Sequence, residues 1–112
     1  MKQQNPLPDL TRAAASFAAL GSEQRLQVLR CLVRAGPAGL RIGDLGTRSG
    51  VSGSTLTHHL KILSAAGLIV QERHGRSTIC AAVAYDDVQA LAGFLLTECC
   101  ADAAQKEGHT HG

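Results

Sequence analysis

The junction at residues 50–52 limits the folds open to this chain, because it separates two helical patterns by only a short turn. Residues 41–50 have apolar residues at helical spacing and end in glycine, which is common where a helix stops. Ser52 is a suitable N-cap for a second helix, over residues 52–66, whose apolar face includes three leucines. The junction therefore predicts a helix, a tight turn and a second helix roughly 20 Å long.

Two further helices are predicted before this junction. Apolar residues recur at helical spacing in residues 9–20, and Gly21 ends the pattern. Ser22 can cap a second helix, which runs to about residue 35 and stops at Gly36-Pro37. The expected apolar faces are Leu10, Ala13, Ala14, Phe17 and Leu20 in the first helix and Leu26, Leu29, Leu32 and Val33 in the second.

A hairpin and a last helix are predicted after the junction. Residues 68–70 open one strand, residues 74–75 form a tight turn between two arginines, and residues 77–83 return as the second strand. Residues 85–100 then form a helix. Its apolar stripe consists of Val88, Leu91, Ala92, Leu95 and Cys99.

These elements together predict an α+β, mostly α fold of about five helices plus a two-stranded β-hairpin. The 112 residues, 45% of them apolar, suffice for one core but not for two domains. We expect one domain over residues 9–100, a flexible N-terminus over residues 1–8 and a flexible polar tail over residues 101–112. Because so small a domain is only marginally stable alone, we expect it to pair with a second copy.

The charges are unevenly distributed, although the net charge is only +2. Residues 1–40 and residues 41–76 each carry five cations against two acids, whereas residues 85–112 carry five acids against one lysine. A basic middle suggests a polyanionic partner. Neither a secretory leader nor an apolar run long enough for a membrane span is seen, so we expect a cytoplasmic protein with reduced cysteines.

Two stretches make a resemblance to a known family specific. They are ALGSEQRLQVLRCLV (residues 19–33) and GVSGSTLTHHLKILSAAGLIVQERHGR (residues 50–76). In this order they resemble the ArsR/SmtB family of winged-helix repressors, and the likeness covers residues 10–100. It implies a winged helix-turn-helix fold with residues 52–66 as the recognition helix and the hairpin as the wing. It also implies a homodimer formed through the first and last helices, a double-stranded DNA partner with an inverted-repeat operator, and no enzymatic activity.

The outward positions of the expected recognition helix suit contact with DNA. Short hydroxyl groups let a helix approach the groove closely, and cations contact phosphates. The hairpin adds two arginines that suit phosphates or the minor groove. The expected DNA-binding residues are Ser52, Ser54, Thr55, Thr57, His58, Lys61, Arg73 and Arg76. His59 instead falls on the leucine side of the helix, where packing is its expected role.

The expected effector site is the pair Cys99-Cys100. It resembles the vicinal thiols of arsenite-responsive members of the family, and soft thiolates suit trivalent arsenic or antimony. Adjacent residues on a helix point about 100° apart, so both sulfurs can meet one ion only if the helix end unwinds. No cofactor is required, and arsenite or antimonite is the expected inducer. The chain departs from the family's other sites, because residues 41–50 lack cysteine and histidine and residues 85–100 lack histidine.

Several alternatives stay open. A third ligand for arsenic could come from a partner chain, a small thiol, or one of Cys31, Cys80, His109 and His111, although packing is the favoured role of Cys31 and Cys80. The input could instead be thiol oxidation, persulfide formation or, less favoured, zinc. A winged helix that binds protein and a thiol oxidoreductase are the other candidates. The oxidoreductase is disfavoured because no C-x-x-C occurs.

Overall fold

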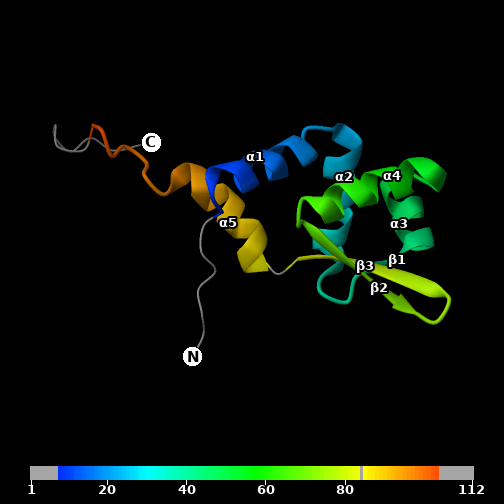
Figure 1. Cartoon of the computed structure of the whole chain (residues 1–112). Helices are drawn as coiled ribbons and strands as arrows, with labels where there is room; N and C mark the ends of the chain where they lie inside the picture. Colours follow the sequence, from blue (N-terminus) through cyan, green and yellow to red (C-terminus); the bar gives the residue numbers. More distant parts are fainter. Residues whose placement is uncertain (1–7, 84, 104–112) are drawn as a thin grey trace, which may run out of the picture.

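Five helices and three strands follow one another in the described part of this computed structural model, residues 8–83 and 85–103 (Figure 1). The helices are α1 (Leu10–Ala19), α2 (Glu23–Ala35), α3 (Ile42–Ser49), α4 (Gly53–Ala65) and α5 (Tyr85–Leu96). The strands are β1 (Leu40–Arg41), β2 (Ile69–His74) and β3 (Ser77–Ala82). The predicted fold class is confirmed. The expected flexible segments 1–8 and 101–112, with His109 and His111, lie largely outside the described residues.

Side-chain caps start the first two helices, and the cap at Ser22 is the one that the sequence predicted. The Asp9 carboxylate accepts a hydrogen bond from the backbone N–H of Arg12 at 2.8 Å. The Ser22 hydroxyl accepts one from the N–H of Arg25 at 3.2 Å. Each bond satisfies an N–H that has no partner inside the helix. None of the described helices has the length and apolar character to cross a bilayer.

The core lies between α2, α3, α4 and the sheet. Its fully buried side chains are Val28, Leu32, Leu45, Leu56, Leu60, Leu63 and Cys80. The apolar face expected for α2 is partly wrong, because Leu26 and Val33 are exposed while Val28 and Cys31 are buried. The reason is tertiary, since α2 packs against α3, α4 and β3, and these neighbours set which side of the helix turns inward.

The sheet holds one strand more than predicted. All pairs are antiparallel in the order β1-β3-β2, and β1 joins through Leu40 opposite Cys80 and Arg41 opposite Ile79. Gly39 allows this approach, because a Cβ at that position would lie 2.2 Å from the Cys80 carbonyl oxygen and its φ is +72°. A two-residue strand is too short to show alternation in the sequence.

The hairpin turn lies one residue later than expected. His74 ends β2 opposite Ser77, so Gly75 and Arg76 form the two-residue turn. Gly75 has φ +66° and Arg76 does not have a positive φ, which fits a type II′ turn. Arg76 therefore stands in the turn itself and not in the returning strand.

The last helix is shorter than predicted. It ends at Leu96 instead of Cys100, and residues 97–103 form turns in which N–H groups bond to carbonyls three residues back, as from Cys99 to Leu96 at 3.0 Å. The Thr97 hydroxyl donates to the Gly93 carbonyl, a back-bond that disfavours continued helix. The expected apolar stripe therefore stops before the cysteine pair.

His59 packs inward, as its place among the leucines predicted, and is only 8% exposed. Its Nδ1 lies 3.3 Å from Arg25 Nη1 and its Nε2 lies 3.0 Å from Gln24 Oε1. Arginine can only donate, so Nδ1 accepts and the ring proton is on Nε2, which donates to Gln24. Burial, and then the charges of Arg25 and His58, lower the pKa of His59. The neutral ring thus links α4 to α2.

Acidification should weaken the fold through His59. Because its pKa in the folded chain is lower than in the unfolded chain, its contribution is complete above about pH 6.5 and is lost as the pH falls below that value. Urea unfolding at pH 7.5 and pH 5.5 should show a smaller loss of stability for His59→Gln than for the wild type. Equal losses in the two proteins would contradict this role.

Candidate nucleic-acid interface and thiol pair

The recognition helix predicted from the sequence, α4, has two clearly different faces. Leu56, Leu60 and Leu63 are at most 2% exposed and hold its inner face in the core. The polar side chains between them, apart from the buried His59, are exposed. Every residue of α4 and its N-cap that the sequence singled out for DNA contact is exposed: Ser52, Ser54, Thr55, Thr57, His58 and Lys61.

Few of these outer groups are engaged within the chain. Ser52 occupies the predicted N-cap position, yet its hydroxyl makes no capping hydrogen bond. The Thr57 hydroxyl donates to the Gly53 carbonyl at 3.4 Å, and Lys61 takes part in no ion pair within the described residues. The outer face of α4 therefore offers hydroxyl and ammonium groups to a partner.

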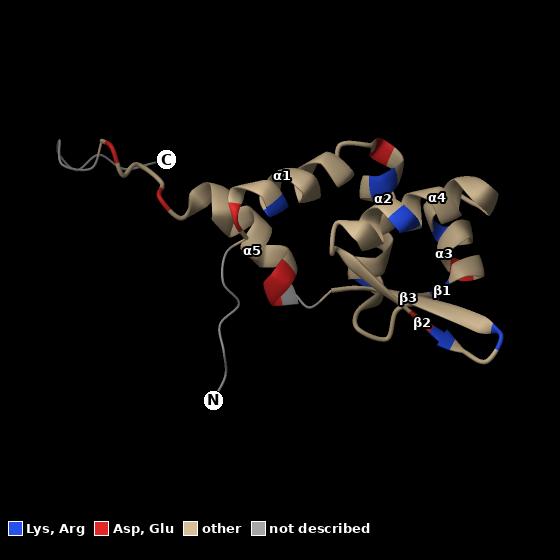
Figure 2. Ribbon diagram, viewed as in Figure 1, with Lys and Arg blue, Asp and Glu red and all other residues tan. Residues whose placement is uncertain are grey.

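The β2–β3 hairpin presents the two arginines singled out from the sequence. Arg73 and Arg76 are both exposed, and Arg73 Nη2 lies 3.5 Å from the carbonyl of Gly75. The nearby acid Glu72 pairs with His74 at 3.1 Å. Figure 2 shows arginine or lysine on α3, α4 and the hairpin, and acidic residues on α5. Acidic residues also stand on α2 and α3, but residues 41–76 carry more cations than acids, whereas α5 carries acids and no cation.

Sequence reasoning missed Arg41 as a candidate contact. Because β1 pairs with β3, Arg41 stands beside the turn end of the hairpin, and with Arg76, Ser77 and Thr78 it lines a hollow of about 440 Å³. The count of cations in residues 41–76 includes Arg41 and was the one signal available. Arg76 lies 35 positions after Arg41 in the sequence, and only the pairing of β1 with β3 brings the two residues near each other.

The two terminal cysteines lie close together. Cys99 Sγ and Cys100 Sγ are 3.6 Å apart, with Cys99 exposed and Cys100 half-buried. From the sequence, both sulfurs could meet one ion only if the helix end unwound. In the structure α5 ends at Leu96, so the two cysteines already lie outside the helix. Cys100 has φ +65°, a backbone conformation that helices do not contain. The hydrogen bond with Cys99, followed by burial and the charge of Cys99, raises the pKa of the Cys100 thiol.

The other two cysteines belong to the core, as favoured from the sequence. Cys31 is 8% exposed on α2 and Cys80 is fully buried on β3, where burial raises the pKa of its thiol. Among the described residues, no group of three or more His, Cys, Asp and Glu side chains could hold a metal ion. The pair Cys99-Cys100 therefore supplies two thiols and no third ligand from the described chain.

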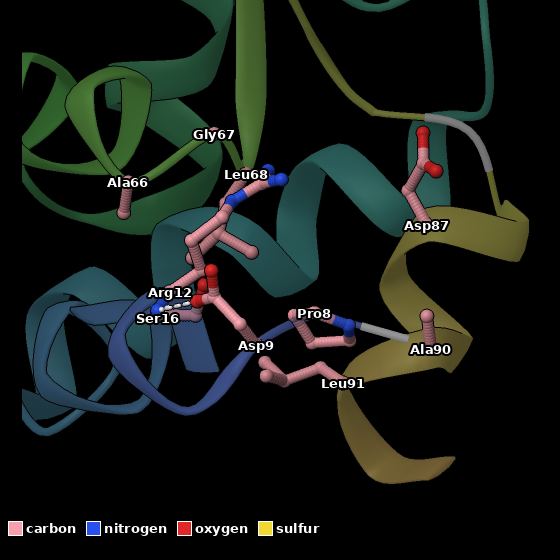
Figure 3. A pocket seen from close by; sticks show the side chains of 10 residues that line it. All are labelled: Pro8, Asp9, Arg12, Ser16, Ala66, Gly67, Leu68, Asp87, Ala90 and Leu91. Atoms are coloured by element: carbon pink, nitrogen blue, oxygen red, sulfur yellow. Dashed lines mark hydrogen bonds between the residues drawn. The ribbon is translucent and has the colours of Figure 1, made fainter. Parts of the chain in front are cut away.

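A hollow of about 410 Å³ lies between α1, α5 and the turn after α4 (Figure 3). Figure 3 shows Arg12 extending from α1 and Asp87 from α5 on different sides of it. Leu91 of α5 is only 8% exposed and lies against the start of α1. The thiol pair is thus connected to the rest of the chain through a helix that packs against α1.

Comparison with known proteins identifies a matching domain family and a curated relative. The helix-turn-helix domain family matches residues 20–72. The chain is similar to the HTH-type transcriptional regulator NmtR of Mycobacterium tuberculosis, with 37% identity over 68 residues. The match covers 61% of this chain and 54% of NmtR, so the chain spans about half the length of that relative.

Solved structures share the fold. An ArsR-like transcriptional regulator from Rhodococcus sp. RHA1 is 30% identical, with 76% of each chain covered and a TM-score of 0.62. The chain is also similar in fold to a homodimeric winged helix-turn-helix DNA-binding domain from Mycobacterium bovis, described as a possible ArsR-family regulator. That domain is 23% identical, with 92% of this chain and 90% of that chain covered and a TM-score of 0.65.

Thiol reactivity should separate the four cysteines into two classes. In the folded protein, a thiol reagent such as dithionitrobenzoate should react with Cys99 and Cys100 at least about tenfold faster than with the buried Cys31 and Cys80. The double substitution Cys99→Ser with Cys100→Ser should remove the fast phase, and denaturant should merge the two phases. A fast phase that survives the double substitution would refute the assignment.

Proposed function

The chain belongs to the ArsR family of winged helix-turn-helix transcriptional regulators, and from this premise we propose that it is a homodimeric repressor that binds duplex DNA in the cytoplasm. Its relatives are regulators of transcription and not enzymes. We further propose that trivalent arsenic or antimony at Cys99 and Cys100 releases the DNA. The DNA part rests on the exposed polar face of α4, and the effector part rests on the geometry of the thiol pair.

The exposure of all eight candidate contacts is the observation that carries the DNA proposal. A helix roughly 20 Å long fits a major groove about 12 Å wide. In this arrangement the hydroxyl groups of Ser54, Thr55 and Thr57 reach base edges or phosphates, and Lys61 contacts a phosphate. Arg73 and Arg76 contact phosphates or enter the adjacent minor groove.

The dimer proposal rests on apolar side chains that the single chain leaves exposed on α1 and α5. Leu10 is 72% exposed, Phe17 39%, and Leu95 and Leu96 65% each. Leu10 and Phe17 belong to the apolar face expected for α1, and no other described residue buries them. Exposed apolar patches of this kind mark interfaces. Two-fold pairing would set the recognition helices about 34 Å apart and make the operator an inverted repeat.

Charged substitutions on this face should weaken the dimer. Phe17→Glu or Leu95→Glu places a charge at the proposed interface, so the dissociation constant measured by sedimentation should rise about tenfold or more. Leu26→Glu is the matched control, because Leu26 is 44% exposed but lies on α2. If all three variants stay as dimeric as the wild type, the interface lies elsewhere.

The thiol pair suits a trivalent metalloid because it offers two soft donors at one exposed point. Arsenous acid reacts with both thiols: two S–As bonds form, two As–OH bonds break, and the hydroxyls leave as water with the thiol protons. A small thiol or a cysteine of a second chain would complete the three-sulfur coordination.

Coupling to DNA follows if α1 and α5 form the dimer interface. A metalloid at residues 99–100 would then act beside the contact that sets the spacing of the two recognition helices. A coupling free energy of about 1–3 kcal/mol changes DNA affinity by about 5- to 150-fold. A modest shift of α5 against its partner is therefore sufficient for release.

Oxidation of the same two thiols is the second candidate input. The 3.6 Å between Cys99 Sγ and Cys100 Sγ must shorten to about 2.05 Å for a disulfide. A two-electron oxidant such as a peroxide would take the two thiol hydrogens and leave an S–S bond. Persulfide formation needs only one of the thiols. Zinc is less favoured, because it prefers four ligands and the pair supplies two.

The effector proposal is tested by DNA binding with and without arsenite. The probe is a labelled duplex from immediately upstream of the chain's own coding region, and the wild type should lose affinity about 5- to 150-fold with arsenite. Cys99→Ser with Cys100→Ser should bind the duplex equally well and ignore arsenite, whereas Cys31→Ala should respond like the wild type. An undiminished arsenite response in the double variant would show that Cys99 and Cys100 are not the arsenite site.

Parallel titrations separate the rivals. A response to peroxide or persulfide donors but not to arsenite selects thiol oxidation, and a response to zinc alone selects a metal site. Binding of DNA through several cations must weaken steeply as salt rises. A chain that binds no duplex at low salt is instead a winged helix that binds protein, and the proposed function is wrong.

A further inference from the structure

Gly43 lies on the outer surface of α3, where the chain gives no internal reason for a glycine. Its φ is not positive, and a Cβ built on it would meet no atom within 4 Å. Glycine in an exposed helix is less stable than alanine, because it loses more conformational freedom on folding. Without a side chain, this position leaves room for another molecule to approach the backbone of α3 closely.

Two hollows meet at this glycine. One, of about 440 Å³, lies between the start of α3 and the turn end of the hairpin, and its lining includes Arg41, Arg76 and two hydroxyl side chains. The other, of about 300 Å³, lies between α3 and the start of α4 and reaches Ser52. Ile42 and Gly43 line both, so the surface is continuous from the recognition helix to the wing. We call the part formed by Arg41, Gly43 and Arg76 the α3 strip.

The cations of the α3 strip are available to an anion. Within the described residues, neither Arg41 nor Arg76 forms an ion pair. Asp44 is the one acid that lines the same hollow, and it too is exposed and makes no ion pair with them. Ser77 and Thr78 add hydroxyl groups to the opposite wall. Two guanidinium groups beside short hydroxyls match phosphate oxygens, and no large exposed apolar side chain lies there to anchor a protein.

We propose that the α3 strip binds the sugar-phosphate backbone of duplex DNA, with Arg41 and Arg76 on phosphates and Gly43 at the point of closest approach. This rests on the proposed DNA-binding function and adds Arg41 and Gly43 to its contacts. The backbone would run from the N-terminal end of α4 across Gly43 to the turn end of the wing. The contact positions the helix in the groove and carries no base sequence information.

The charge part of the proposal is tested by salt dependence. Binding to a random-sequence duplex of about 30 base pairs is followed by fluorescence anisotropy between 50 and 200 mM NaCl. Loss of one phosphate contact in Arg41→Gln should reduce the slope of log affinity against log salt by about 0.9. Arg30→Gln is the matched control, since Arg30 is exposed on α2 and lines neither hollow. An Arg41→Gln slope equal to that of the wild type overturns the proposal.

The steric part is tested at Gly43. Gly43→Ala should raise the melting temperature by roughly 2–6 °C, because the side chain meets only open space. The same variant should bind the duplex several-fold more weakly, and Gly43→Leu should bind more weakly still. Unchanged affinity in both variants overturns the close approach. A wild type that binds no duplex overturns the proposed function as well, so the two failures are distinguishable.

Discussion

The burial of the leucine face of α4 is the contact on which the rest of the structure depends. Leu56, Leu60 and Leu63 are almost wholly removed from solvent, and each buried leucine side chain stabilises the fold by about 1.5–3 kcal/mol. Successive residues on a helix are about 100° apart, so a shift of one position would turn Thr57 inward and a leucine outward. The core therefore fixes the rotation of α4, and the rotation decides which side chains a partner meets. His59 adds a polar link to α2 on the same inner face.

Features set by local residues were predictable, and features set by distant contacts were not. The cap at Ser22, the end of α3 at Gly50 and the two faces of α4 follow from residues within one or two turns. The buried side of α2 depends on which elements surround it. Helical spacing alone predicted that Leu26 is buried, but it is exposed. The register of the hairpin turn was missed by one residue, because Gly75 fits either of two adjacent turn positions.

The strand β1 shows how a minor element can reorganise a surface. It contributes only Leu40 and Arg41, and it exists because Gly39 lets the chain approach the Cys80 carbonyl. No periodicity can reveal a strand of two residues, so only the count of cations in residues 41–76 linked Arg41 with Arg76. Once the pairing forms, a cation that looked like part of an ordinary helix start stands beside the wing. The candidate DNA surface thus combines two parts. The exposed face of α4 follows from residues close together in the sequence, whereas Arg41 joins it only because β1 pairs with β3.

The thiol pair and the candidate DNA surface belong to different parts of the chain, and the contacts between elements limit how one can influence the other. The helix α5 packs against α1, and α1 in turn packs against α4. The same two helices, α1 and α5, carry exposed apolar side chains such as Leu10 and Leu95. A ligand at Cys99 and Cys100 that moved α5 would therefore change the surface proposed for pairing before it disturbed the leucine core. Under the proposed function, regulation would alter the spacing of two intact recognition helices and leave the fold of each one unchanged.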